Sequence, residues 1–417
     1  LKPSSVPAGL VRRRRPEMSG GLDGQEGFDD DSEDPPVIII DNGTGMCKAG
    51  MSTDELPAHV FAEAIGQPRT STKDVLTSEY YFGDDALAQG NRLFVSYPME
   101  YGIIENFEQM EKIWEYTLNE RLQVNAMEHP MLLTEPPYNP KPNREKVVEI
   151  MFETFNTPAL SIAIQGVLAI LGQGRTTGII LDSGEGATHT FPIFDGFGMS
   201  HCINRIDLAG KELNVLLGKL LAMDGNSLTT TEDQHQTRLM KEKLCYVALD
   251  PSREQDSFAE ERASGAGEVA EEKSYTLPDG REIHISDWRW QCPEALFTPQ
   301  LCGLEAEGVA RMIWNSVTSC EIDLRKQLLS NVVLSGGSTK FPGFRERLLK
   351  DLRALAPTTA QASIKIVNSK DQDYAVWVGA QVSATLRAMQ EDQWMTSEDY
   401  DEYGASYIHE KMMLKYS

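Results

Sequence analysis

Two short segments of the chain share an arrangement of residues that could bind phosphate. These segments are VIIIDNGTG at Val37–Gly45 and GIILDSGEG at Gly178–Gly186. Each is a β-branched apolar run followed by an aspartate and by two glycines that are separated by one residue. The apolar run predicts a buried strand, and the glycines predict a tight turn whose backbone N–H groups can approach an anion. A single D-x-G-x-G is also typical of an ordinary turn or of half a calcium loop. Two copies predict a duplicated domain with facing phosphate loops that hold a nucleotide between them.

The side chains beside these turns suit a triphosphate and its metal ion. Backbone N–H groups of Gly43–Thr44–Gly45 and Gly184–Glu185–Gly186 would bind the phosphates, and Lys48 would add a positive charge. Asp41 and Asp182 end the two strands, and two carboxylates at this place could hold a divalent ion through its water shell. The alternative is that each aspartate only caps its own turn.

Hydrolysis of the terminal phosphate needs a water molecule held in line with it. Gln165 is the only polar side chain in the apolar run IAIQGVLAIL, so it is one candidate to orient that water. His189, just after the second loop, is the other. A glutamine bonded to the core backbone and a structural histidine are the alternatives.

A third glycine-rich segment, Val332–Gly343, again follows an apolar run. Gly336 and Gly337, with Ser338 beside them, could admit a base or ribose, and Phe341 could lie against an adenine. An ordinary turn is the alternative. A helix expected over Glu232–Leu249 carries further polar residues that could meet the base and ribose: Arg238, Lys241 and Glu242.

Composition limits the class of protein. The formal net charge of −24 argues against nucleic acid or anionic lipid as the main partner and favours basic partners or cation-mediated self-association. Acidity that only keeps the protein soluble is the alternative. The longest apolar stretch, Ser161–Leu171, is too short to span a membrane. The six cysteines form no C-x-x-C pair, which predicts reduced thiols in the cytosol or nucleus.

The rest of the chain alternates strands with helices, which indicates an α/β protein. Helices are expected over Glu108–Leu122, Asn143–Phe155 and Gly343–Leu355, with Asn143 as a cap. Pro251–Glu272 is expected to be an exposed loop or short helix with a hinge at Gly265–Ala266–Gly267.

Two further segments lie outside this pattern. A hairpin is expected from Ser274–Leu277 and Glu282–Ile285 around an Asp-Gly turn. Residues 1–35 are predicted to form a disordered arm, with a basic block at Arg12–Arg15 and an acidic cluster at Asp29–Asp34. The basic block could also be a nuclear-import signal.

From about Pro36 to Met413 the chain resembles eukaryotic actin. The matching segments are long: IDNGTGMCKAG at Ile40–Gly50, LLTEPPYNPKPNREK at Leu132–Lys146, MFETFNTPAL at Met151–Leu160, GRTTGIILDSGEGATH at Gly174–His189 and KEKLCYVALD at Lys241–Asp250.

This resemblance implies the actin-like fold, in which two duplicated ribonuclease-H-like domains hold ATP or ADP and Mg²⁺ or Ca²⁺ in a central cleft. The first half would cover 36–172, with a small subdomain at about 63–97, and would be completed by 375–417. The second would cover 173–374, with a small subdomain at about 209–304.

The resemblance also implies roles for residues. Gln165 and His189 would position the attacking water, in a slow hydrolysis that filament assembly accelerates. Asp54, Glu55 and the acidic cluster at Asp29–Asp34 are similar to the surface that actin presents to myosin. The nucleotide contacts implied by the same comparison are Gly43, Thr44, Gly45, Met46, Lys48, Asp182, Gly184, Gly186, Arg238, Lys241, Glu242, Gly337 and Phe341.

Several positions depart from the family pattern. Glu185 stands where the pattern has aspartate, which puts the metal geometry and the hydrolysis rate in question. Asp373 replaces a usual lysine near the adenine, and Tyr101 replaces a histidine that is commonly methylated. Thr70–Tyr80, in the place of the loop by which one subunit grips the next, is shorter and lacks the family's Met and Gly residues. Leu301–Leu304 is a variant apolar plug.

The sequence therefore predicts a divergent actin of the cytoplasm and cytoskeleton, also possible in the nucleus, that binds and slowly hydrolyses ATP. It would form filaments or join those of conventional actin, and bind myosin and actin-binding proteins. The first alternative is a non-polymerising actin-related subunit of a chromatin-remodelling or dynein-associated complex. The second is a small-molecule kinase or chaperone with the same ATPase core.

Overall fold

Two β-sheets carry the two D-x-G-x-G turns. The computed structural model describes residues 35–72, 76–264, 273–367, 372–385 and 391–412. In the first sheet, of order β18-β10-β9-β1-β2-β3, β1 pairs antiparallel with β2 and parallel with β9. Its strands are β1 (Ile38–Asn42), β2 (Met46–Met51), β3 (His59–Ala62), β9 (Met131–Glu135), β10 (Ala159–Ile164) and β18 (Met395–Thr396).

The second sheet repeats the central pairing of the first. Its order is β13-β12-β11-β17, and β11 pairs antiparallel with β12 and parallel with β17, as β1 does with β2 and β9. The strand that leads into each D-x-G-x-G turn therefore has the same neighbours in both sheets. The strands of this sheet are β11 (Gly178–Ser183), β12 (Thr188–Phe194), β13 (Phe197–Gly198), β14 (Asn204–Ile206), which pairs with β12, and β17 (Val332–Ser335).

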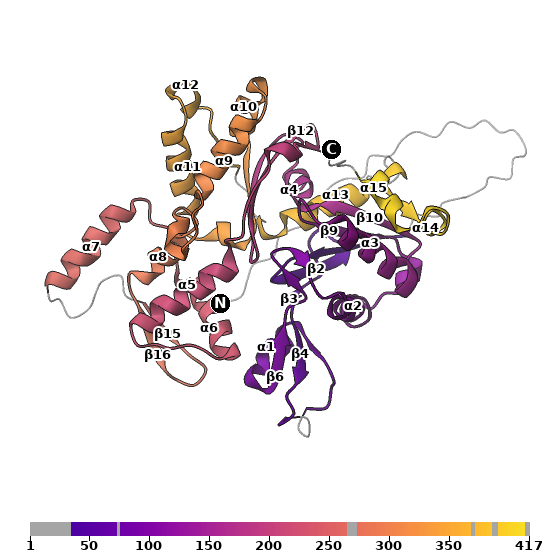
Figure 1. The fold of residues 1–417 in the computed structure, drawn as a ribbon, viewed down its shortest axis with the longest axis horizontal. Coiled ribbons are helices and arrows are strands. Elements are labelled where there is room, and N and C mark those ends of the chain that lie inside the picture. The colour runs from indigo at the N-terminus through magenta and orange to yellow at the C-terminus, as the bar shows by residue number, and fades with distance from the viewer. Residues whose placement is uncertain (1–34, 73–75, 265–272, 368–371, 386–390, 413–417) are drawn as a thin grey trace, which may run out of the picture. The chain divides into compact units, whose positions relative to one another are not determined.

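Helix α4 (Gln165–Leu171) contacts strands of both sheets, and α13 (Ala375–Thr385) packs on α4 and on β1 and β9 of the first sheet. Strands buried on both faces have nearly continuous apolar sequences, as the all-buried β1 and β9 do. The two helices cross closely, because a Cβ on Gly379 would lie 1.8 Å from the carbonyl oxygen of Leu168. Residues of α13, β18 and α15 thus pack into the core that β1, β9 and β10 begin, and these elements lie beside one another in Figure 1.

The two sides of β11 face different cores. Ile180 belongs to the first core, with Trp114 and Trp377, whereas Ile179 and Leu181 belong to the second. This follows from the alternation of side chains along a strand.

The remaining elements surround these two sheets. Small sheets pair β4 (Ile65–Pro68), β5 (Tyr81–Phe82) and β6 (Leu93–Ser96); β7 (Met99–Glu100) and β8 (Ile103–Ile104); and β15 (Lys273–Thr276) and β16 (Glu282–Ile285). The longer helices are α2 (Phe107–Tyr116), α3 (Lys141–Glu149), α5 (Gly210–Met223), α6 (Thr231–Leu244), α7 (Pro251–Ser264), α9 (Val309–Ser319), α10 (Ile322–Leu329) and α11 (Phe344–Leu355), and the shorter ones are α1 (Gly83–Ala88), α8 (Trp288–Glu294), α12 (Thr358–Gln361), α14 (Ser397–Tyr403) and α15 (Ile408–Lys411).

Two of the expected helices differ at their boundaries. The expected helix 108–122 is α2, which begins at Phe107 after the Asn106 cap and continues as a π-helical segment over Thr117–Leu122. The expected helix 143–155 begins at Lys141 and passes into a π-helical segment over Ile150–Thr154.

Asn143 is not the cap of α3. Proline suits the first helical turn because its fixed φ is already helical, and here Pro140 precedes the helix and Pro142 lies in its first turn. The helix therefore starts before Asn143, whose side-chain amide donates to the Ile104 carbonyl at 2.8 Å.

The helix expected over Glu232–Leu249 ends at Leu244 instead. Cys245 has an extended backbone, and the next residues bond to other segments: Tyr246 N–H donates to the Arg289 carbonyl and Val247 N–H to the Pro342 carbonyl. The expected helix 343–355 begins one residue later, at Phe344.

The hairpin prediction is confirmed by β15 and β16. The segment from Pro251 is helical to Ser264, and its expected hinge at 265–267 lies outside the described residues, as do the arm at 1–34, Arg12–Arg15 and the acidic cluster at 29–34. Within the described part of the chain, no helix combines the length and apolar character needed to traverse a lipid bilayer. The subdomain boundaries stay a prediction.

Candidate functional site

The two glycine loops lie against each other. A Cβ on Gly186 would lie 2.4 Å from Thr44 Oγ1, and a Cβ on Gly45 would lie 2.9 Å from Glu185 Cβ. Only glycine leaves room for such an approach. The turn between β7 and β8 contacts both loops, because Gly102 N–H donates to Thr44 Oγ1 at 2.8 Å and a Cβ on Gly186 would lie 2.9 Å from Tyr101 Cα. The backbone amides of both loops are therefore brought into one place.

Lys48 lies between the two predicted aspartates. Its ammonium group is 2.8 Å from Asp41 Oδ2 and also feels the charge of Asp182. Burial alone would lower the pKa of Lys48, but the carboxylates raise it above its ordinary value. Burial raises the pKa of Asp182, against the opposing effects of the Ser335 hydroxyl and of Lys48. This arrangement holds a permanent positive charge beside the first loop.

Gln165 is the first residue of α4 and reaches back to β1. Its Nε2 donates to the Asn42 carbonyl at 3.2 Å, to Thr134 Oγ1 at 3.3 Å and to Asp41 Oδ1 at 3.4 Å. Thr134 Oγ1 also donates to Asp41 Oδ1 at 2.6 Å. All three contacts of Gln165 use the amide nitrogen, so its carbonyl oxygen is the atom that can accept a hydrogen bond from water.

His189 faces Asp182 across the β11–β12 pair. Its ring is buried, and its Nε2 has no hydrogen-bond partner. Burial, with the positive charge of Arg205, lowers the pKa of His189 to about 4. The imidazole is therefore neutral at physiological pH, and a buried neutral nitrogen without a partner is a suitable place for an ordered water.

The third glycine-rich segment packs on the second loop. A Cβ on Gly336 would lie 2.3 Å from the Ser183 carbonyl oxygen, and Ser338 Oγ donates to the Gly184 carbonyl at 2.7 Å. Gly337 has open space where a side chain would be. Phe341 is mostly buried in the second core, so only a small part of its ring is accessible to a ligand.

Glu185 is directed toward two helices. Its Oε1 accepts from Asn214 Nδ2 at 3.0 Å, and its Oε2 lies where a Cβ on Gly210, the first residue of α5, would be 2.2 Å away. Lys241 of α6 is 3.9 Å from the same carboxylate and donates to the Gly210 carbonyl at 2.8 Å. The negative charge is thus held at the N-terminus of α5, where a helix favours it.

The other polar residues of this region are paired. Arg238 Nε donates to Glu242 Oε1 at 2.9 Å. Asp373, in place of the usual lysine, forms an ion pair with Lys340, so a lysine is still present at this place although it comes from the third glycine-rich segment. Tyr101 lies in the turn between β7 and β8 with φ of 50°, and Arg205 Nη2 donates to its carbonyl at 3.0 Å.

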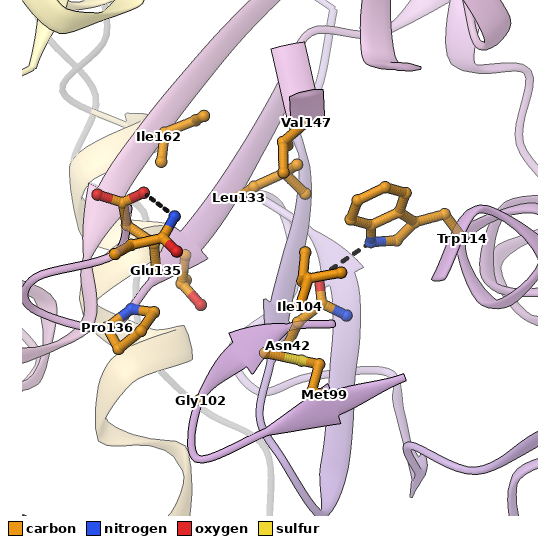
Figure 2. Close-up of a pocket in the computed structure, with 12 residues that line it drawn as sticks. Asn42, Met99, Gly102, Ile104, Trp114, Leu133, Glu135, Pro136, Val147 and Ile162 are labelled. Atoms are coloured by element: carbon orange, nitrogen blue, oxygen red, sulfur yellow. Dashed lines mark hydrogen bonds between the residues drawn. The ribbon is translucent and has the colours of Figure 1, made fainter. Parts of the chain in front are cut away.

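A small cavity of about 30 Å³ lies behind the first loop (Figure 2). Asn42 extends into it, and Trp114 Nε1 donates to Asn42 Oδ1 at 3.0 Å. On another wall, Asn139 Nδ2 donates to Glu135 Oε2 at 2.8 Å. Polar groups on two walls suit an ordered water in this cavity, which is lined by Asn42 and Thr134, two residues that Gln165 contacts.

Replacing Glu185 with aspartate is expected to destabilise the fold by about 1 kcal/mol, because a side chain one methylene shorter loses the Asn214 hydrogen bond. Urea denaturation of E185D and the unchanged protein measures this. In the matched pair N214A and E185D/N214A the additional loss should disappear. An equal loss in both backgrounds would show that Asn214 is not the partner that matters.

Several residues of the site were not found from the sequence. Hydrogen bonds in the site also come from Thr134, Asn214 and Ser335. A polar residue at the carboxyl end of an apolar strand is a sequence pattern that could have marked Thr134 and Ser335 as candidates. Asn214 lies within a helix and gave none. Among the described residues, no three His, Cys, Asp or Glu side chains are grouped so as to hold a metal ion, so Asp41 and Asp182 stay candidates for contact through water only.

One comparison with known proteins bears on this site. A family model whose description is Actin matches residues 32–413 of the 417-residue chain.

Proposed function

Since the chain belongs to the actin family, we propose that it binds ATP, hydrolyses it slowly, and assembles into filaments or joins filaments of conventional actin. Proteins of this family have the actin-like fold and generally bind and hydrolyse ATP with a divalent cation. The observation that supports the proposal most directly is the contact of the two glycine loops, with Lys48 between the aspartates that precede them.

Some residues of the site would bind the nucleotide, and others would orient the attacking water. Backbone N–H groups of the two loops, with Lys48, would bind the phosphates. Gln165 Oε1 and the neutral ring of His189 would orient the attacking water, which is the main requirement of phosphoryl transfer. Mg²⁺ or Ca²⁺, held through water by Asp41 and Asp182, would neutralise charge on the phosphates when bound. Arg238, Lys241 and Glu242 would contact the base and ribose.

We further propose other copies of the chain, conventional actin and actin-binding proteins, including myosin, as partners in the cytoplasm and cytoskeleton. Glu55 is exposed beside β2 and supports an acidic binding surface. Asp54 has a structural use as well, because its Oδ2 accepts from Met51 N–H at 2.8 Å and closes the turn that carries Glu55.

One observation favours the alternative of a non-polymerising subunit. The start of Thr70–Tyr80 is tied to its own sheet, because Thr72 Oγ1 donates to the Arg92 carbonyl at 2.8 Å. Thr70, Ser71 and Thr72, held in this way, have less freedom to contact a neighbouring subunit.

Sedimentation separates the two. With ATP, Mg²⁺ and salt, the purified chain is expected to pellet above a threshold concentration, alone or with conventional actin. Protein stripped of nucleotide is the control and should stay soluble. A chain that binds ATP but remains in the supernatant in both mixtures would favour the fixed subunit, and a chain that binds no ATP would contradict the proposal.

A further inference from the structure

A buried acid lies directly beside the first glycine loop. Glu63, between β3 and β4, is 0% exposed, and its neighbours along the chain are Phe61, Ala62, Ala64 and Ile65, all buried and apolar. A carboxyl group is rarely found in such a place unless it is paired with a positive charge. Within the described residues, Glu63 forms no ion pair.

Glu63 is bonded to both ends of the loop. At the beginning, Asn42 Nδ2 donates to Glu63 Oε1 at 3.1 Å. At the end, the backbone N–H of Glu63 donates to the Gly45 carbonyl at 3.1 Å. One residue therefore spans Asn42–Gly43–Thr44–Gly45, the segment whose amides would bind phosphate.

The Asn42 side chain transmits this restraint. Its Oδ1 accepts from Trp114 Nε1 at 3.0 Å, so its orientation is set and its Nδ2 faces Glu63 (Figure 2 shows the Trp114 bond). Its backbone carbonyl accepts from Gln165 Nε2 at 3.2 Å. A shift of Asn42 would consequently move both the loop and the glutamine proposed to orient water.

The second carboxyl oxygen, Glu63 Oε2, is buried and has no hydrogen-bond partner. An ionised oxygen in that position would be costly, and a proton removes the charge. Three titratable groups influence Glu63: Cys47 of β2 lies beside it, and Asp41 of β1 and Lys48 of β2 act through their charges. Tyr116 and Arg121 pack on Phe61, two residues earlier. Lys48 is already 2.8 Å from Asp41.

These surroundings favour the neutral acid. Burial raises the pKa of Glu63 to about 8, with the Asp41 carboxylate acting in the same direction and the Asn42 hydrogen bond against it. Asp41 and Asn42 are successive residues of β1, so their side chains point to opposite faces, and Glu63 lies on the face of Asn42 and its cross-strand partner Cys47.

We propose that Glu63 is a positioning residue that clamps the two ends of the first glycine loop as a neutral carboxylic acid, so that loss of its proton loosens the hold on the nucleotide. The inference rests on the proposed function, because it assumes that this loop binds phosphate.

The first experiment measures the dissociation rate of a fluorescent adenine nucleotide between pH 6.5 and 9.5. In the unchanged protein the rate should rise about tenfold between pH 7 and pH 9, since the ionised fraction of a group with a pKa of about 8 changes by that factor. Glu63→Gln keeps an acceptor oxygen and cannot ionise, so its rate should stay low and flat. Glu63→Ala should release nucleotide quickly at every pH.

The control is Glu305→Gln, the same chemical change at an exposed residue of the second half, which should keep the pH response of the unchanged protein. A rise in E63Q equal to that of the unchanged protein would overturn the clamp. If the unchanged protein retains no nucleotide at any pH, the proposed function fails, and the clamp with it.

The second experiment needs no nucleotide. The pKa of Glu63 is raised in the folded state, so the folded protein binds a proton that the unfolded chain has lost. Stability must then fall as the pH rises from about 4.5 to about 8 and change no further above it. Thermal unfolding should show the melting temperature of E63Q rising relative to that of the unchanged protein as the pH increases to 8. A difference in melting temperature that is the same at every pH would refute the neutral acid.

Discussion

Replacing Gln165 with alanine is expected to slow ATP turnover roughly 100-fold, the usual scale for a group that positions or polarises a reacting water. Nucleotide affinity should change much less, because the phosphates would be bound by the loop amides and Lys48. The physical reason lies in the amide: its nitrogen is held by Asn42, Thr134 and Asp41, so its oxygen has a fixed direction. Single-turnover phosphate production and nucleotide dissociation, measured in parallel, separate the two effects.

Gln327→Ala is the matched control, since it removes the same amide from an exposed position of α10. It should leave turnover unchanged. Unchanged turnover in Q165A as well would remove Gln165 from the mechanism. A loss of affinity as large as the loss of turnover would instead assign it to binding.

Replacing Lys48 with methionine is expected to have the largest effect on nucleotide binding. The substitution removes the positive charge beside the first loop and leaves Asp41, which is 2% exposed, without its ion pair. Breaking a buried pair in this way typically costs about 3 kcal/mol or more. Urea stability should fall by that amount. Separately, removing the charged partner of the phosphates typically costs about 2–5 kcal/mol of binding, so we expect nucleotide affinity to fall about 100-fold.

A second buried pair distinguishes these two losses. Arg347 and Glu294 form an ion pair at 2.8 Å in the second core, away from the loops. Arg347→Met should lower stability to a similar extent and leave the affinity for nucleotide within a few-fold. Similar losses of affinity in both variants would mean that Lys48 acts only through stability.

Much of the site could be predicted from local sequence, because the signals there are short. A β-branched run, an aspartate and two spaced glycines predict a strand and a turn without any tertiary information. The strands predicted from the two copies are present as β1 and β11. The glycine spacing also predicted that the loops would meet, since two copies at strand ends imply a repeated unit. Gln165 is a candidate from sequence alone because a single polar side chain within an apolar run needs a hydrogen-bond partner.

Helix boundaries were predicted less well, since distant partners decide them. Cys245 to Leu249 continue the helical spacing of α6, yet the backbone of Tyr246 and Val247 bonds to segments far along the chain. The start of α3 was set by prolines on either side of Lys141 rather than by the polar side chain of Asn143.

Glu63 and Glu185 show what sequence cannot supply. Glu63 was missed because its significance depends on Asn42, 21 positions away in sequence, and on a missing partner for Oε2. Glu185 was noticed as an unusual residue, but its direction toward Asn214 and Lys241 depends on how α5 and α6 pack. The ion pair between Lys340 and Asp373 likewise joins residues that lie 33 positions apart in the sequence.

The packing of α13 and β18 sets the order in which this chain can fold during synthesis. The strands β1, β2 and β9 leave the ribosome well before α13 and β18, so α4 lacks its partner α13, and β10 its neighbour β18, until residues 375–396 have been translated. Contacts between such distant residues form slowly. The nascent first half therefore keeps apolar surface exposed during this time, so a ribosome stalled before the codon for Ala375 would leave an aggregation-prone fragment rather than a stable domain.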